Sequence, residues 1–320
     1  MNETISRRAL LASAAGTLLL GGYSIVRTQN PEERSHDLPV VTCTIGMITD
    51  VVQNIGGNTF AISGLMGPGI DPHLYKPSAG DIVRLGDADL VLFNGLHLEG
   101  RLADTLENIH EAGQVLTRPV AESIPESQLL RSDDDTDSWD PHVWMDVSLW
   151  DIVAGAITEE LILLNPDGAE QISERSAVYR HRLAELEDWV FSEFARVPDD
   201  IRVLVTAHDA FNYFGRRYDI EVLGLQGLST ATEAGAADVQ SLAKMLAERK
   251  IPAIFVESSI PPSTIEAVQA ASQARGWDVQ IGGELYSDAM GASGTPEGTY
   301  IGMVRHNVST VVEALLRESQ

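Results

Sequence analysis

Three histidines stand in settings that suit metal ligation. His73 and His142 each end an Asp-Pro-His tripeptide, at residues 71–73 and 140–142. Because proline fixes its own φ and restricts the residue before it, each tripeptide predicts a stiff loop that aims an imidazole. His208 follows an apolar, strand-like run, and we expect it at the carboxyl end of a parallel strand, where open α/β sheets bind ligands.

A carboxylate completes the set. Asp288 also comes just after a predicted strand, in the segment Gly-Gly-Glu-Leu-Tyr-Ser-Asp. Imidazole nitrogens with a carboxylate oxygen suit zinc, and also manganese or iron. The sequence therefore predicts one metal site made by His73, His142, His208 and a carboxylate of this segment.

Other polar residues make weaker candidates. Glu257 and Glu284 follow strands, and we expect them to cap helices or to contact a neighbouring lobe. The remaining histidines have polar or helical surroundings; His97, which also follows a strand, is the first alternative ligand. They are His36, His97, His110, His181 and His306.

Motifs for catalysis are missing. The chain has no His-Glu-x-x-His helix, no glycine-rich phosphate loop with lysine, and no Gly-x-Ser-x-Gly elbow. We therefore assign no catalytic residue and no organic cofactor, and predict that the protein is not an enzyme. Two alternatives keep the same ligands: a metal-dependent hydrolase with an open coordination position, and an adhesin that uses the metal structurally.

The elements that must position these residues alternate between apolar strand-like runs and helical patterns. This alternation predicts an α/β fold with two lobes, each with a mainly parallel sheet flanked by helices. Strands are expected at 40–48, 61–65, 90–93, 202–206, 254–256 and 279–281. Helices are expected at 51–56, 78–85, 209–217, 230–249, 262–275 and 298–316, the one at 230 opened by a Thr-x-x-Glu capping box.

Between the two halves lies a long helical pattern. Asn165 and Pro166 predict its start, and apolar residues recur at helical spacing to about residue 195. At about 1.5 Å a residue, such a helix is roughly 45 Å long and can bridge two lobes rigidly. The expected organisation is an export signal and linker at 1–38, an N-terminal lobe at 39–164, the connecting helix at 165–197 and a C-terminal lobe at 198–320.

The N-terminal segment predicts export. Arg7 and Arg8 precede an apolar stretch that ends near Val26, a pattern that resembles a twin-arginine signal. We expect a periplasmic or extracytoplasmic protein, and an uncleaved N-terminal anchor is an alternative. No cysteine follows the stretch to carry a lipid, and the single cysteine, Cys43, lies in an apolar run and is expected in the core.

Composition narrows the class of partner. The 320 residues carry 47 acidic and 22 basic side chains, a formal net charge of −25. This charge excludes nucleic acid and argues against an anionic membrane surface, because both attract Lys and Arg. We interpret most of it as a solvated coat. The acidic run at 132–138 is expected to be a surface loop.

Six segments together resemble the metal-binding solute-binding proteins of ABC transporters, the cluster A-I zinc/manganese-binding family, and in particular its treponemal TroA-like branch. The resemblance covers the chain from about residue 41. The segments are 71–78, 87–99, 140–146, 205–211, 224–230 and 281–290.

This resemblance implies a function. It places the family's metal ligands on His73 and His142 in one lobe and on His208 and Asp288 in the other, around one zinc or manganese ion that is transported. It implies a monomer that delivers the ion to the membrane permease of an ABC importer. The resemblance does not decide between zinc and manganese as the bound metal. The loop that is often histidine-rich in zinc-binding members is acidic here, whereas many manganese-binding members have Glu in place of His208.

Overall fold

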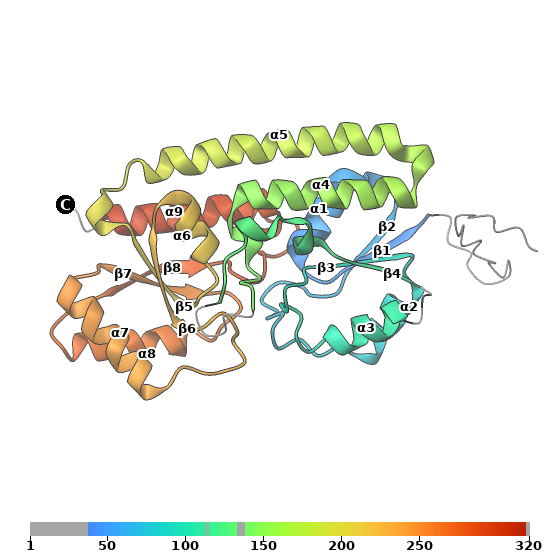
Figure 1. Cartoon of the computed structure of the whole chain (residues 1–320). Coiled ribbons are helices and arrows are strands. Elements are labelled where there is room, and N and C mark those ends of the chain that lie inside the picture. Colours follow the sequence, from blue (N-terminus) through green and yellow to red (C-terminus); the bar gives the residue numbers. More distant parts are fainter. Residues whose placement is uncertain (1–37, 112, 114, 133–137, 318–320) are drawn as a thin grey trace, which may run out of the picture. The chain divides into compact units, whose positions relative to one another are not determined.

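The computed structural model describes residues 38–317, apart from residues 112, 114 and 133–137. The expected export signal and all but the ends of the acidic run at 132–138 therefore lie outside the described residues. The described residues form one compact unit, which contains two α/β lobes (Figure 1).

The N-terminal lobe is built on a parallel sheet. Its strands are β1 (Val40–Cys43), β2 (Ala61–Gly64), β3 (Leu90–Phe93) and β4 (Leu116–Pro119), in the order β2-β1-β3-β4. Helices α1 (Gly46–Gly56) and α4 (Val147–Leu164) lie on one side of the sheet, and α2 (Ala79–Asp87) and α3 (Ala103–Glu111) on the other (Figure 1). A sheet covered on both faces explains why β1 and β3 are almost entirely apolar.

The C-terminal lobe repeats the parallel pattern with two strand pairs. β5 (Val203–His208) pairs with β6 (Glu221–Gln226), β7 (Ala253–Glu257) pairs with β8 (Gln280–Leu285), and β5 contacts β7. Four helices surround them: α6 (Asn212–Tyr218), α7 (Ala236–Arg249), α8 (Ser263–Gln273) and α9 (Tyr300–Arg317).

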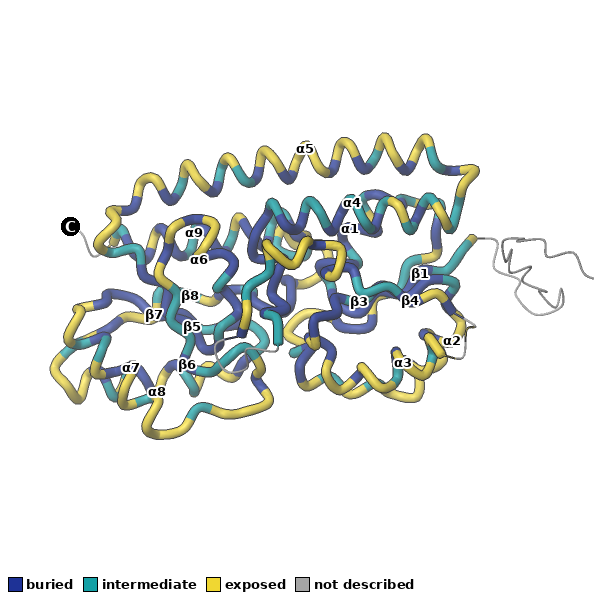
Figure 2. Tube along the Cα trace, in the orientation of Figure 1, coloured by how far each residue is buried: buried dark blue, intermediate teal, exposed yellow. Residues whose placement is uncertain are grey.

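Helix α5 (Ala169–Phe194) bridges the lobes. It packs against α1 and α4 of the first lobe and α9 of the second, and so extends across both lobes (Figure 1). One stripe of its surface is buried and the opposite stripe is exposed, as Figure 2 shows. Tyr179, Leu183 and Leu186 join a single apolar core that also contains side chains from both lobes. The predicted bridging helix is thus confirmed, and it is part of the packed interior rather than a free linker.

The prediction for the start of this helix is also borne out in its detail. The Asn165 side chain accepts a hydrogen bond from the backbone N–H of Gly168, at 3.3 Å. Pro166 opens a short 3-10 turn, Pro166–Gly168, that leads into α5. Proline fits there because the first N–H groups of a helix have no intrahelical partner.

Several predicted elements are wrong at their boundaries, and two of these errors have a clear physical reason. The strand expected at 40–48 ends at Cys43, and α1 begins at Gly46, because α1 is buried around much of its circumference and its apolar run looks like a strand. The helix expected from residue 230 begins at Ala236, where Asp238 accepts from the backbone N–H of Gly235. Thr230 instead donates to Asp71 of the other lobe.

Four elements were not predicted: α3, α4, β4 and β6. Helix α4 has little amphipathic contrast because α1 and α5 both cover it, so its sequence lacks a clear helical period. Within residues 38–317, the part of the chain that is described, no helix is long and apolar enough to cross a membrane.

Candidate metal centre

The two Asp-Pro-His tripeptides form the same local structure. In each, the aspartate Oδ1 accepts a hydrogen bond from the backbone N–H of the histidine two residues later: 2.8 Å from Asp71 to His73 and 2.9 Å from Asp140 to His142. The proline between them holds the turn, so the imidazole leaves the backbone in a fixed direction. The Asp-Pro-His sequence thus occurs twice because each copy forms a turn that directs a histidine side chain.

His208 is held from its own strand end. It is the last residue of β5, at the carboxyl end of a parallel strand as predicted. Its backbone N–H donates to Oε1 of Glu257 at 2.9 Å, and its Nδ1 lies 2.7 Å from Oε2 of the same carboxylate. Glu257 ends the neighbouring strand β7 and is buried. It orients an imidazole of its own lobe, whereas we predicted that it caps a helix or contacts the other lobe.

Asp288 lies three residues beyond β8, and its carboxylate meets all three imidazoles. The Nε2 atoms of His208, His142 and His73 lie 3.3, 3.5 and 3.7 Å from its oxygens. The Nε2 atoms of His73 and His142 are 3.3 Å apart. All four donor groups lie within 4.8 Å of one another, and all four residues are buried.

These spacings match those around a single ion. Metal bonds of about 2.0–2.1 Å at tetrahedral angles place donor atoms about 3.4 Å apart. The Nε2 of His208 and both carboxylate oxygens of Asp288 are buried without a hydrogen-bond partner. Because unpaired buried polar atoms are costly, the arrangement calls for a cation at the centre. Three imidazoles and one carboxylate form a donor set that zinc or manganese accepts.

In the metal-free protein, the charges of these residues shift one another's pKa values. Burial, helped by the nearby charges of His142 and His208, lowers the pKa of His73 to about 3 against the opposing effect of Asp288. Burial opposes charge on His142 as well, but Asp140 and Asp288 outweigh it and raise its pKa to about 9. In the same way Glu257 and Asp288 hold the pKa of His208 well above its ordinary value, while the imidazoles hold the pKa of Asp288 well below its own.

Hydrogen bonds between the lobes lie beside the four clustered residues. The indole N–H of Trp144, two residues after His142, donates to the carbonyl of Ser287 at 2.9 Å. The Tyr300 hydroxyl donates to the carbonyl of Trp144 at 2.7 Å. Sequence reasoning did not single out Trp144, because the signal available was only its place two residues after His142.

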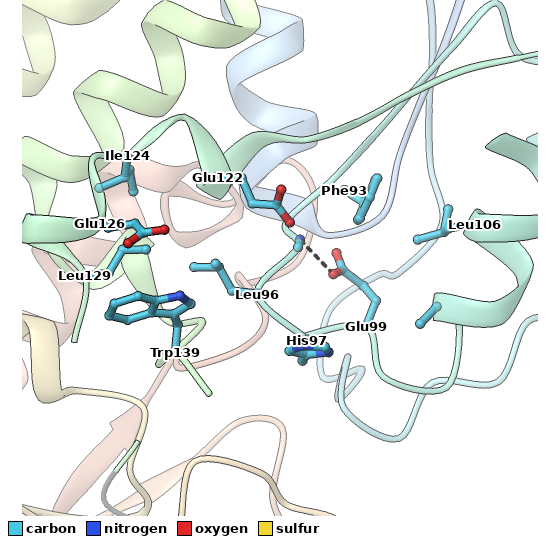
Figure 3. Close-up of a pocket in the computed structure, with 12 residues that line it drawn as sticks. Phe93, Leu96, His97, Glu99, Leu106, Glu122, Ile124, Glu126, Leu129 and Trp139 are labelled. Atoms are coloured by element: carbon cyan, nitrogen blue, oxygen red, sulfur yellow. Dashed lines mark hydrogen bonds between the residues drawn. The ribbon is translucent and has the colours of Figure 1, made fainter. Parts of the chain in front are cut away.

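Figure 3 shows the cavity beside His97, the alternative ligand. His97 is exposed on the wall of a separate cavity of about 440 Å³ that also contains Glu122 and Trp139. His97 is not one of the four clustered residues. Its loop has a supporting role, however, because Asn94 donates to the carbonyl of Pro141 at 3.0 Å, next to His142.

The remaining sequence candidates lie elsewhere. Glu284 and His181 are exposed, and His181 pairs loosely with Glu185 at 3.5 Å. His110 contacts Thr117, and His306 contacts the carbonyl of Glu284. His36 lies outside the described residues.

Comparisons with known proteins show which proteins this chain resembles. Residues 41–314 match the family described as "Zinc-uptake complex component A periplasmic". The zinc-binding protein TroA of Treponema pallidum is 51% identical over 279 residues, which cover 87% of this chain and 89% of that one. The manganese-binding lipoprotein MntA of Bacillus subtilis is 46% identical over 275 residues, covering 86% and 89%.

A solved structure supports the same relationship. The structure of the periplasmic zinc-binding protein TroA from Treponema pallidum superposes with a TM-score of 0.85, covering 87% of this chain and 99% of that chain. Proteins of this family bind metal for transport and are not enzymes. From its matched length and its similarity to these relatives, this chain belongs to the periplasmic zinc-uptake component A family of metal-binding solute-binding proteins.

Proposed function

We propose that this protein is an extracytoplasmic solute-binding protein that captures one zinc or manganese ion and delivers it to the membrane permease of an ABC importer. His73 and His142 from the N-terminal lobe and His208 and Asp288 from the C-terminal lobe hold the ion. The observation that carries the proposal is the convergence of buried, unpartnered donor atoms on one point. Relatives named as zinc-binding and manganese-binding proteins support the two metals.

The donor set favours carriage over catalysis. Catalytic zinc sites keep a coordination position open for water, whereas four protein ligands close the shell. All four residues are buried, and the lobes contact each other around them. The hydrolase alternative is therefore not favoured, and nothing in the site favours an adhesin.

We also propose an oligomeric state, a mode of export and a domain organisation for this protein. We expect a monomer without affinity for nucleic acid, in keeping with the net charge of −25. Export follows a twin-arginine-like signal within residues 1–38, which is either cleaved or kept as an anchor. The working parts are the lobes at 39–164 and 198–320 and the connecting helix at 165–197.

Metal titration of chelator-stripped protein tests the proposal. Zinc and manganese should each bind with a stoichiometry of one, and His208→Ala should weaken both ions because it removes one ligand. His97→Ala is the matched control, since His97 is exposed and outside the cluster. A protein that takes up no ion, or a His208→Ala variant with native affinity, would contradict the assignment.

A further inference from the structure

The four ligands have almost no contact with solvent. His142 and His208 are 0% exposed, Asp288 2% and His73 6%. An ion that is captured and later released must therefore pass through the protein at some side of the site. The question is which side can open at the smallest cost.

Three sides are closed by hydrogen bonds between the lobes. Each bond involves a residue within two positions of a ligand, so opening there would disturb the ligand's own loop. The bonds are Thr230 to Asp71 at 2.5 Å, Tyr213 to the carbonyl of Asp140 at 2.9 Å, and Trp144 to the carbonyl of Ser287 at 2.9 Å.

The side towards Met290 is different. A cavity of about 140 Å³ lies between the lobes and has Asp288 in its wall. Thr49, Met66 and Gly67 line it from one lobe and Met290 from the other. The two other cavities described, beside His97 and beside α5, contain none of the four ligands. At about 30 Å³ for each water molecule, the volume holds about five waters, enough for a partly hydrated ion.

We propose that this cavity is the passage by which the metal ion reaches and leaves Asp288, with the Met290 side chain as its movable inner wall. The proposal rests on the proposed function. The Cε atom of Met290 would lie 3.2 Å from a Cβ built on Gly46, at the start of α1, so the methyl packs against backbone. A methionine side chain turns about three bonds and can swing aside while the lobes stay in place.

Reversible blocking of the passage tests this inference. Gly67 is exposed, its φ is not positive, and a Cβ there meets nothing within 4 Å, so Gly67→Cys should fold normally. A bulky methanethiosulfonate reagent attached to that thiol narrows the passage, and a reductant removes it. The native thiol does not interfere, because Cys43 is buried and burial raises its pKa to about 12.

Stopped-flow kinetics with zinc give the readout. Labelling Gly67→Cys should slow both association and dissociation by about tenfold, and reduction should restore both rates. The dissociation constant should not change, because it depends only on the free and bound end states. The control is Gly86→Cys, at an equally open and exposed position on α2 outside the cavity, where the label should change neither rate.

The possible outcomes separate the two proposals. If the labelled Gly67→Cys protein binds with native rates, the ion uses another route and the passage is refuted. A raised dissociation constant after labelling also counts against the passage, because the label would then act on the ligands themselves. If unlabelled native protein takes up no metal, the proposed function fails, independently of the label.

Discussion

Glu257→Gln should weaken metal binding although Glu257 is not a ligand. The native carboxylate accepts from both the backbone N–H and the Nδ1–H of His208, at 2.9 and 2.7 Å. These bonds fix the tautomer in which Nε2 is free for the metal, and they raise the basicity of the imidazole. Glutamine has almost the same shape but only one acceptor oxygen, so one of the two donors must face an amide NH₂.

The expected effect of Glu257→Gln has two parts, a loss of metal affinity and a loss of fold stability. Loss of such a partner to a metal-bound histidine lowers affinity by about 10–100-fold, which corresponds to about 1.4–2.7 kcal/mol. One buried donor without a partner should also lower the stability of the metal-free fold by about 1–3 kcal/mol. Both effects should appear together, since Glu257 and His208 are each buried almost completely.

Competition titration against a chromophoric chelator measures the affinity, and thermal unfolding of the metal-free protein measures the stability. Glu284→Gln is the control: Glu284 lies on the adjacent strand β8 but is exposed. Native affinity in Glu257→Gln, with the same unfolding temperature, would refute the reasoning that this carboxylate positions His208.

Three further results are expected. His208→Glu should lower the ratio of zinc to manganese affinity, because a carboxylate is a harder donor than imidazole; competition titrations with both ions measure it, and an unchanged ratio would contradict it. Metal binding should release protons and strengthen as pH rises towards about 9, because the metal-free protein holds a proton on His142, whose pKa is raised to about 9; calorimetry in buffers of different ionisation enthalpy counts these protons, and pH-independent binding would exclude the mechanism. Trp144→Phe should speed metal dissociation, because it removes the bond to Ser287 beside Asp288; stopped-flow chelation shows this, and a native rate would mean that the bond does not hold the site closed.

Local sequence was sufficient to place His73 and His142 on loops and His208 at the end of a strand. The Asp-Pro-His repeat encodes its own turn, since Asp71 and Asp140 accept from residues only two positions away. The alternation of strands and helices likewise predicted the α/β lobes. The connecting helix was recognisable because Asn165 and Pro166 mark its start.

Interactions between residues far apart in the chain could not be predicted from the sequence. Glu257 lies 49 positions after His208, and Ser287 lies 143 positions after Trp144, so no local pattern connects either pair. The same reason explains Thr230. Its Thr-x-x-Glu setting predicts a helix cap, but the hydroxyl instead donates to Asp71, which lies 159 positions earlier. Helix α4 was missed because tertiary burial on several sides removes the periodicity by which a helix is recognised.

The single bridging helix has a consequence for sensor design. A helix of 26 residues that is packed along both lobes resists bending, since bending must lengthen its backbone hydrogen bonds. Fluorophores placed one on each lobe should therefore change their separation little when metal is added, and energy transfer between them should be a poor indicator. A single environment-sensitive dye beside the cavity at Gly67 is the better design, because it reports on the loops around the ion rather than on the distance between the lobes.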